Sequence, residues 1–165
     1  MYTLKKDSGV TLLEMMAVFV IISILAVIGL PSLFSMMQSS KVREDHDRIL
    51  SLLRSSQRNA IRMSKGCTLT FNLSSDVLSS VSKSDLGCFS DSFDNFSSNI
   101  KIDNPVISFS FRGHTINDSF ILLYSPDSEI KKCIAISNHL GLIRSGSYQA
   151  NVNQTLDKSQ CKTNI

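Results

Sequence analysis

The sequence predicts an α+β protein in which a long N-terminal α-helix packs on an antiparallel β-sheet domain. Three observations predict this class: an apolar run over residues 10–30, an amphipathic stretch over about 32–63, and short strand-like segments from residue 67 onward. The run has the length of a membrane span, the stretch has helical spacing, and the segments alternate with a period of two. A chain of 165 residues is long enough for one domain with a modest core.

The apolar run from Val10 to Leu30 predicts the membrane-spanning first half of the helix. Its 21 residues (30 − 10 + 1) would rise about 31 Å as a helix, close to the thickness of the hydrocarbon layer of a bilayer. Lys5 and Lys6 precede it, and the positive-inside bias would hold that end in the cytoplasm. The chain beyond Leu30 would then face the periplasm or the outside.

Glu14 distinguishes this run from simpler membrane-directing segments. A secretory signal would have an apolar region of about 7–15 residues and a small-residue cleavage site, whereas this run is longer and no A-x-A site follows it. A plain signal anchor is a second alternative, but it has no use for a carboxylate, which costs a few kcal/mol inside a membrane. Glu14 is therefore a candidate functional residue.

The stretch over about 32–63 predicts the second half of the helix. Pro31 has no backbone N–H to donate, so we expect a kink near the membrane exit. The apolar stripe beyond it predicts the face packed on a sheet. Between residues 41 and 65 there are seven basic and three acidic residues, a pattern typical of a solvated face with local ion pairs. Lys65 and Gly66 predict the helix end. The stripe consists of Val42, His46, Ile49, Leu53, Ala60 and Met63.

The remaining chain predicts short antiparallel strands. The Ser-rich part over 74–98 predicts loops and short strands, and the polar tail after Asn151 predicts a segment held by Cys161. A turn at 138–141 would join the last two strands into a hairpin. The predicted strands are 67–73, 99–102, 106–112, 120–124, 132–137 and 142–148.

All four cysteines lie beyond the apolar run. None forms a C-x-x-C pair, which argues against a zinc ribbon or a thioredoxin-type site. An even number beyond a membrane segment indicates an oxidising compartment and two disulfides, and free thiols of a cytosolic protein are the alternative. Of the three connectivities, we favour Cys67–Cys88 and Cys133–Cys161, because these pairs are nearest in the chain.

The residues Gly9-Val10-Thr11-Leu12-Leu13-Glu14 resemble the prepilin peptidase site of type IV pilins and type II secretion pseudopilins. The resemblance implies a leader peptide at 1–9, cleavage between Gly9 and Val10, and N-methylation of Val10. Glu14 then becomes the fifth mature residue, where the family has its Glu. Pro31 becomes mature residue 22 (31 − 9), where the family often has a Pro. Val10 departs from the usual Phe.

The segments beyond Cys67 resemble the GspH/FimT family of minor pilins. Phe109-Ser110-Phe111-Arg112-Gly113 resembles a strand-then-Gly element of that family, and residues 133–137 with Gly141-Leu142-Ile143-Arg144 resemble its closing hairpin. FimT-like members with a Gly-Arg-x-Arg hairpin bind DNA during natural transformation. This sequence has Leu142 at the first Arg position and keeps Arg144, so the candidate DNA-binding residues are Arg144, Lys131, Lys132 and Arg112.

The resemblance implies a structural subunit with three parts. Residues 1–9 would be the leader, 10–30 the transmembrane and assembly helix, and 31–165 the periplasmic globular domain. The protein would cross the bacterial inner membrane once and enter a pilus or pseudopilus. Its expected partners are other pilin subunits, the prepilin peptidase, the inner-membrane assembly platform and, as a further hypothesis, double-stranded DNA. We expect a minor pilin of a type IV pilus, with the H-type pseudopilin of a type II secretion system as the alternative.

The sequence does not predict an enzyme, a metal site or a cofactor. The three histidines, His46, His114 and His139, stand in unrelated contexts. The sequence contains no G-x-S-x-G, H-E-x-x-H or Walker-type motif. The net charge of +3 is too small to indicate a partner by itself.

Overall fold

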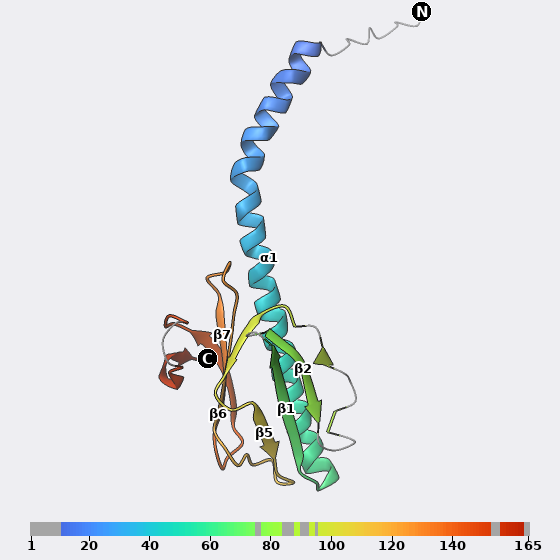
Figure 1. The fold of residues 1–165 in the computed structure, drawn as a ribbon, viewed down its shortest axis with the longest axis vertical. Helices are drawn as coiled ribbons and strands as arrows, with labels where there is room; N and C mark the ends of the chain where they lie inside the picture. The colour runs from blue at the N-terminus through green and yellow to red at the C-terminus, as the bar shows by residue number, and fades with distance from the viewer. Residues whose placement is uncertain are drawn as a thin grey trace, which may run out of the picture. The chain divides into compact units, whose positions relative to one another are not determined.

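The computed structural model describes residues 11–74, 77–83, 88–89, 93–94, 96–152 and 156–163, and its architecture is α+β, as predicted. Helix α1 (Leu12–Met63) precedes the strands, and a 3₁₀ turn, η1 (Lys158–Gln160), lies near the C-terminus (Figure 1). The chain divides into two compact units, Met1–Met36 and Met37–Ile165. The strands are β1 (Cys67–Ser74), β2 (Val77–Lys83), β3 (Phe93–Asp94), β4 (Asn99–Ile102), β5 (Val106–Phe109), β6 (Ser119–Tyr124), β7 (Lys131–Ile136), β8 (Ile143–Tyr148) and β9 (Cys161–Lys162).

Helix α1 ends at Met63, and the next residue, Ser64, takes a left-handed conformation with a φ of 52°. The N–H of Ser64 donates to the carbonyl of Ile61, and the N–H of Lys65 donates to the carbonyl of Ala60. This pair of bonds is a Schellman motif. The helix therefore ends at Met63, at the predicted limit of about residue 63, but Ser64 and not Gly66 takes the left-handed conformation that we assigned to glycine.

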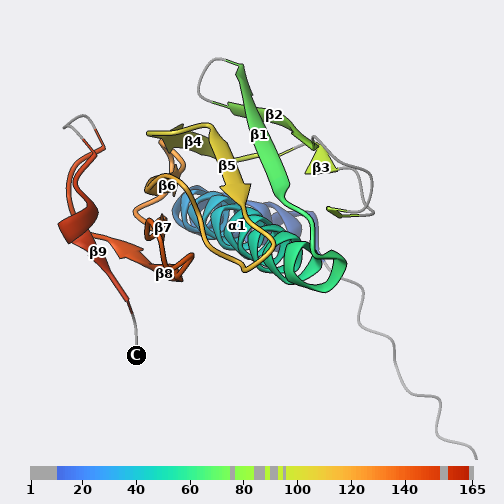
Figure 2. The same ribbon diagram turned by 90° about the horizontal axis from the view of Figure 1, so that it is seen from below.

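The strands form one antiparallel sheet in the order β5-β1-β2-β4-β6-β7-β8-β9, with β3 paired to β2. Strand β2 meets β4 through a single residue pair, Val77 with Asn99, whereas β6 and β7 are paired over six residues. Within the second unit, the helix lies against one face of this curved sheet (Figure 2). The Ser-rich part that we predicted as loops and short strands contains the seven-residue strand β2.

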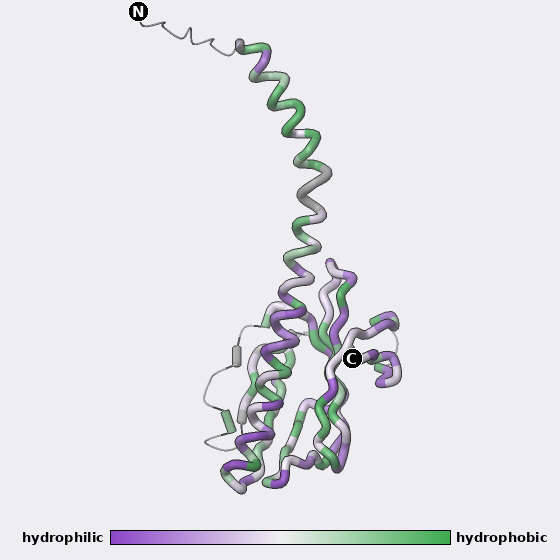
Figure 3. Tube along the Cα trace, turned by 180° about the vertical axis from the view of Figure 1, so that it is seen from behind, coloured by the Kyte–Doolittle hydropathy of each residue, from purple (hydrophilic) through white to green (hydrophobic). Residues whose placement is uncertain are grey.

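The main core lies between the second half of α1 and the sheet. The predicted stripe is buried at Val42, His46, Ile49, Leu53 and Ala60, but Met63 is 44% exposed because it lies in the last turn. Figure 3 shows the change along α1 from mainly hydrophobic colour near its start to alternating colour beside the sheet. The sheet contributes further buried side chains to this core, including Leu69, Phe71, Ile100, Ile107, Phe109, Ile121, Leu123, Ile134 and Ile136.

A buried carboxylate ties α1 to the start of β4. Asp45 is 3% exposed, and its Oδ2 accepts the backbone N–H groups of Ser97 at 2.9 Å and Ser98 at 2.8 Å. Arg48 lies one turn further along, with its guanidinium 5.1 Å from the centroid of Phe96. Hydrogen bonds to a charged acceptor are stronger than neutral ones, so this contact fixes the chain entering β4 on the helix.

The C-terminal segment covers the other face of β6 and β7. Phe120, Leu122, Cys133 and Tyr148 form a second buried cluster there. Strand β6 therefore buries both faces, which explains its continuous apolar sequence. In η1, hydrogen bonds from the backbone and hydroxyl of Ser159 lower the pKa of the Asp157 carboxyl. Partly buried residues of the segment pack against the cluster: Ala150, Val152, Leu156 and Cys161.

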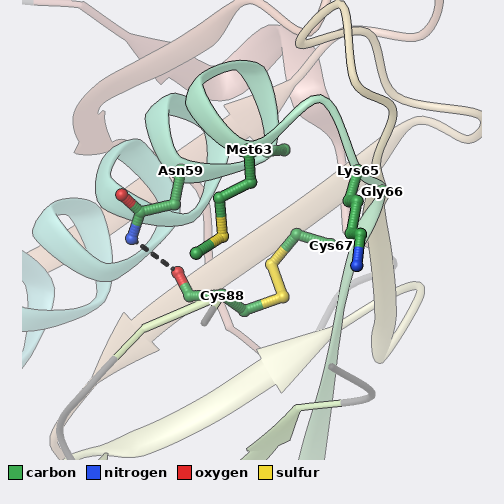
Figure 4. A pocket seen from close by; sticks show the side chains of 7 residues that line it. Asn59, Met63, Lys65, Gly66, Cys67 and Cys88 are labelled. Carbon is green, nitrogen blue, oxygen red and sulfur yellow. Dashed lines mark hydrogen bonds between the residues drawn. A yellow bond between two sulfur atoms is a disulfide. The ribbon is translucent and has the colours of Figure 1, made fainter. Parts of the chain in front are cut away.

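Two disulfides connect these parts, and they are the two pairs that we favoured from the sequence. Cys133–Cys161 holds the C-terminal segment to β7, and Cys67–Cys88 lies beneath the last turns of α1. Figure 4 shows Asn59 of α1 directed at Cys88, whose carbonyl accepts its side-chain N–H at 2.9 Å. The cavity beside this disulfide is about 10 Å³. That volume is close to the minimum for one water molecule, so the cavity is too small for an organic ligand.

Strand β5 ends at Phe109, three residues before the predicted end at Arg112. The N–H of Ser110 donates to the carbonyl of His114, and the N–H of Gly113 donates to the carbonyl of Ser110. Gly113 has a φ of 80°, and a Cβ there would lie 2.9 Å from Cδ1 of Ile61. The tight turn closed by Gly113 therefore stops the strand.

Gln57 joins this turn to the hairpin between β7 and β8. Its side-chain N–H group donates to the carbonyls of Gly113 and Gly141, both at 2.8 Å. Gly141 has a φ of 61°, and a Cβ added to it would lie 2.0 Å from the carbonyl oxygen of Gly113. The helix, the turn and the hairpin therefore meet at Gly141, and no residue with a Cβ fits at that position without a shift of the backbone.

We predict that Gly141→Ala destabilises the second unit while Gly66→Ala does not. The left-handed conformation alone costs an alanine about 1–2 kcal/mol, and the contact with Gly113 adds to it. A Cβ at Gly66 has its nearest neighbour at 3.5 Å, an ordinary contact. Thermal unfolding of the full chain in detergent, followed by near-ultraviolet circular dichroism, compares the two. Equal midpoints for both variants would contradict this account of the contact.

Candidate assembly site

The first turn of α1 is capped by Thr11. Its Oγ1 accepts the backbone N–H of Glu14 at 3.3 Å, and its carbonyl accepts the N–H of Met15 at 3.2 Å. Thr11 is therefore the N-cap and Glu14 the third helical residue, the Thr-x-x-Glu spacing of a capping box. The cap fixes where the helix begins and hence how far Glu14 stands from that end.

Glu14 is the acidic residue of this first turn. A carboxylate is favoured there because the unpaired N–H groups at a helix start carry partial positive charge. Its side chain is exposed, and no cation within salt-bridge distance of it is found in the described part of the chain. Gly9 and Val10, the predicted cleavage and methylation positions, lie outside the described residues.

The apolar side chains after Glu14 are uncovered. Every described side chain from residue 12 to residue 27 is exposed, and this part of α1 is long and apolar enough to cross a membrane. The helix continues without interruption through Pro31. Exposed apolar side chains continue beyond it at Leu33, Phe34, Met36 and Met37, so the uncovered apolar part extends past the predicted limit at Leu30.

The candidate DNA-binding residues lie at separate places in the second unit. Arg144 on β8 pairs with Ala135 of β7, whereas Lys131 is four residues from Ala135, about 13 Å along the strand. Lys132 points to the opposite face from Lys131 because neighbouring residues of a strand alternate. Arg112 lies in the turn after β5 with its guanidinium 5.2 Å from the centroid of Phe111.

The ammonium groups of both lysines already make hydrogen bonds within the chain. Lys131 donates to the carbonyl of Ala150 at 3.0 Å, and Lys132 donates to the hydroxyl of Ser147 at 3.4 Å. Arg144 is exposed and lines an open depression together with Lys158. Lys158 lies 3.4 Å from Asp103 and 3.7 Å from Asp118, so nearby carboxylates partly neutralise it. The structure therefore does not gather the four candidates into one basic cluster.

Two contacts were missed from the sequence. The Thr-x-x-Glu spacing was a signal for the cap at Thr11, although we used those residues only for the motif. No pattern distinguished Gln57, because its partners are backbone carbonyls far away in the chain. In the part of the chain that is described, no group of three or more His, Cys, Asp or Glu side chains is placed to hold a metal ion.

The comparisons with known proteins identify the N-terminal segment. Residues 4–30 match the family model described as the prokaryotic N-terminal methylation motif. No curated protein and no solved structure gives a significant match to the chain.

The methylation motif and the apolar start of α1 indicate the class of protein. They support a type IV pilin-like or pseudopilin protein, and the motif is typical of structural subunits. The motif implies processing by a prepilin peptidase and assembly with other pilin subunits. The apolar helix is consistent with anchoring in a membrane.

We predict that Thr11→Val frays the first turn of α1, whereas Thr11→Ser leaves it intact. Valine has the shape of threonine but no oxygen to accept the N–H of Glu14, and loss of an N-cap costs about 0.5–2 kcal/mol. Hydrogen exchange of the amides of residues 12–15, measured on the full chain in lipid nanodiscs, reports the fraying. Unchanged protection in Thr11→Val would show that the cap does not hold this turn.

Proposed function

We propose that this chain is a minor pilin of a type IV pilus, which enters or primes the filament through its N-terminal helix. Residues 1–9 are the leader, 10–30 cross the inner membrane once, and 31–165 form the periplasmic domain. The observation that carries this proposal is the capped, uncovered apolar start of α1 with Glu14 in its first turn, matched by the methylation motif.

Cleavage between Gly9 and Val10 gives the helix a new positive end. The amine of Val10 then stands one residue before the N-cap Thr11, and Glu14 stands four residues after Val10. A carboxylate in lipid costs a few kcal/mol unless a partner neutralises it. The methylated amine of a neighbouring subunit supplies that partner and favours assembly in one register.

The same apolar surface serves two successive states. In the membrane, lipid covers the exposed side chains from Leu12 to Val27. In the filament, apolar helices of neighbouring subunits cover them, together with Leu33, Phe34, Met36 and Met37. Pro31 lies between these two groups and, in this proposal, kinks the helix near the membrane exit. The assembly platform of the inner membrane transfers the subunit between the two states.

The alternative is the H-type minor pseudopilin of a type II secretion system. It uses the same leader, methylated amine and Glu14, so the assembly site supports both proposals equally. The identity of the filament in which the protein is recovered distinguishes them. The GspH/FimT assignment belongs to this proposal and rests on the resemblance of residues 109–113 and 133–144.

We predict that Glu14→Gln reduces recovery of the protein in sheared filaments at least tenfold and leaves its amount in the membrane unchanged. Glutamine keeps the size of the side chain but is neutral, so it cannot form an ion pair with a charged amine. Glu44→Gln, an exposed residue of the second unit, is the matched control. Immunoblots of membrane and filament fractions measure both. Normal filament recovery of Glu14→Gln would refute the proposed pairing.

A contribution to DNA uptake is a second candidate function. The exposed guanidinium of Arg144 beside an open depression favours it, with the exposed Arg112 as a second phosphate contact. Contacts of this kind bind phosphates without reading sequence, so their affinity falls as salt rises. The internal hydrogen bonds of Lys131 and Lys132 reduce their share of such binding.

We predict that the full chain in detergent shifts double-stranded DNA at about 50 mM salt and that Arg144→Ala weakens this shift several-fold. Lys41→Ala, which removes an exposed cation of α1, is the matched control and should bind as the natural sequence does. Electrophoretic mobility over a salt series measures the effect. Absence of any shift at the lowest salt, or equal loss in both variants, would reject Arg144 as a DNA contact.

A further inference from the structure

The outward face of the last turns of α1 carries a row of arginines. Arg54, Arg58 and Arg62 are four residues apart, so they lie on one side of the helix, and all three are exposed. From Arg48 to Lys65 the sequence contains five cations and no acid. We call Arg54, Arg58 and Arg62 the arginine row.

The arginine row makes no salt bridge with any residue that the structure describes. Like charges four residues apart on a helix repel each other by about 0.2–0.5 kcal/mol per pair. Within the described residues, the salt bridges involve His46, Arg48 and Lys158 and none of the three arginines. A face that is only solvated would gain by alternating glutamate with arginine, as the start of the same segment does at Glu44 and Asp47.

Exposed apolar side chains border the arginine row. Ile61 is 49% exposed, and its side chain lies against Gly113, so the turn that carries Phe111 lies beside it. Phe111 is 52% exposed and Met63 is 44% exposed. On the other side of the row, Asp47, Leu50 and Ser51 line an open depression with Arg54 and Arg58. Arginine, methionine and aromatic residues are enriched in protein–protein interfaces, whereas a surface for phosphates needs no apolar border.

We propose that the arginine row and its apolar border form a docking face for an acidic neighbouring subunit of the filament, different from this chain. The partner presents carboxylates at matching intervals, about 6 Å for each four residues of a helix. Arginine pairs with carboxylates through two parallel hydrogen bonds, which fixes the partner in register. The inference rests on the proposed function for the nature of the partner.

A second copy of the chain complements this face poorly. In the part of this helix that belongs to the second unit, the exposed carboxylates are Glu44 and Asp47, and Asp47 already accepts a hydrogen bond from His46 at 2.9 Å. The other exposed acids among the described residues lie in the connections after β4, β5, β6 and β8, away from this helix: Asp103, Asp118, Asp127, Glu129 and Asp157. The charge of the face therefore favours a partner with its own acidic surface.

Site-specific photocrosslinking of the full chain in its native membrane tests the proposal. The photoreactive residue replaces Ser51, beside the arginine row, or Gln149, an exposed position after β8 that serves as the control. We expect the Ser51 position to give an adduct with another protein that carries its own prepilin-type N-terminus. The adduct should decrease at least tenfold in the triple variant Arg54→Glu, Arg58→Glu, Arg62→Glu and persist in Lys41→Glu, which reverses a charge elsewhere on α1.

An adduct between two copies of this chain, or an adduct that nuclease removes, would overturn the docking face. It would also be overturned if the adduct yield at Ser51 is no higher than at Gln149, or if charge reversal of the arginines does not change that yield. Thermal unfolding of the triple variant Arg54→Gln, Arg58→Gln, Arg62→Gln gives an independent check. We expect no loss of stability, and a lowered midpoint would mean that the arginines are paired within the chain. Filament recovery is scored in the same cells. If the protein is recovered in filaments but gives no adduct, only the docking face is rejected. If it gives the adduct but is not recovered in filaments, the proposed function is rejected.

Discussion

The first half of α1 exposes apolar side chains that no described part of the chain covers, and this constraint governs the rest of the molecule. Burial of such surface is worth about 25 cal/mol per Å², so residues 12–27 must be covered by lipid or by other proteins. Glu14 lies within this surface, and its carboxylate costs a few kcal/mol in lipid unless a partner neutralises it. Thr11 caps the helix three residues before Glu14. An apolar helix with one acid near its start is stable only in an assembly or a membrane that covers the apolar side chains and accommodates the carboxylate.

The second half of α1 differs from the first, because its inward face is buried in the core that it forms with the sheet. Its inward face contributes Val42, Ile49 and Leu53 to the main core. Polar side chains of the same helix reach the loops at its flanks: Asp45 holds the entry to β4, and Gln57 holds the turn after β5 and the β7–β8 hairpin. Each of these bonds satisfies backbone groups that would otherwise be buried without partners. The outward face carries charges, and there Arg54, Arg58 and Arg62 make no salt bridge with a described residue.

Most of the fold follows from residue patterns, and the exceptions have local physical causes. The apolar run and the stripe at Val42, Ile49 and Leu53 predict one long helix and its buried face, since helical periodicity records burial directly. Met63 has the correct spacing but lies in the last turn of the helix and is 44% exposed. Strand β2 was not predicted as a full strand, because serines have weak strand preference and its pairing with β1 decides the outcome. The separation of Arg144 from Lys131 depends on strand register, and the clamp at Gln57 depends on contacts distant in sequence. Neither is encoded in a local pattern.

The central claim is that a processing step gives the apolar helix a positive amine four residues before Glu14. Mass spectrometry of the N-terminal peptide from protein isolated in its native membrane tests this claim most directly. The account predicts a chain that begins at Val10, with one methyl group on its amine. A native protein that retains Met1, or whose first residue lies elsewhere in the apolar run, would contradict it.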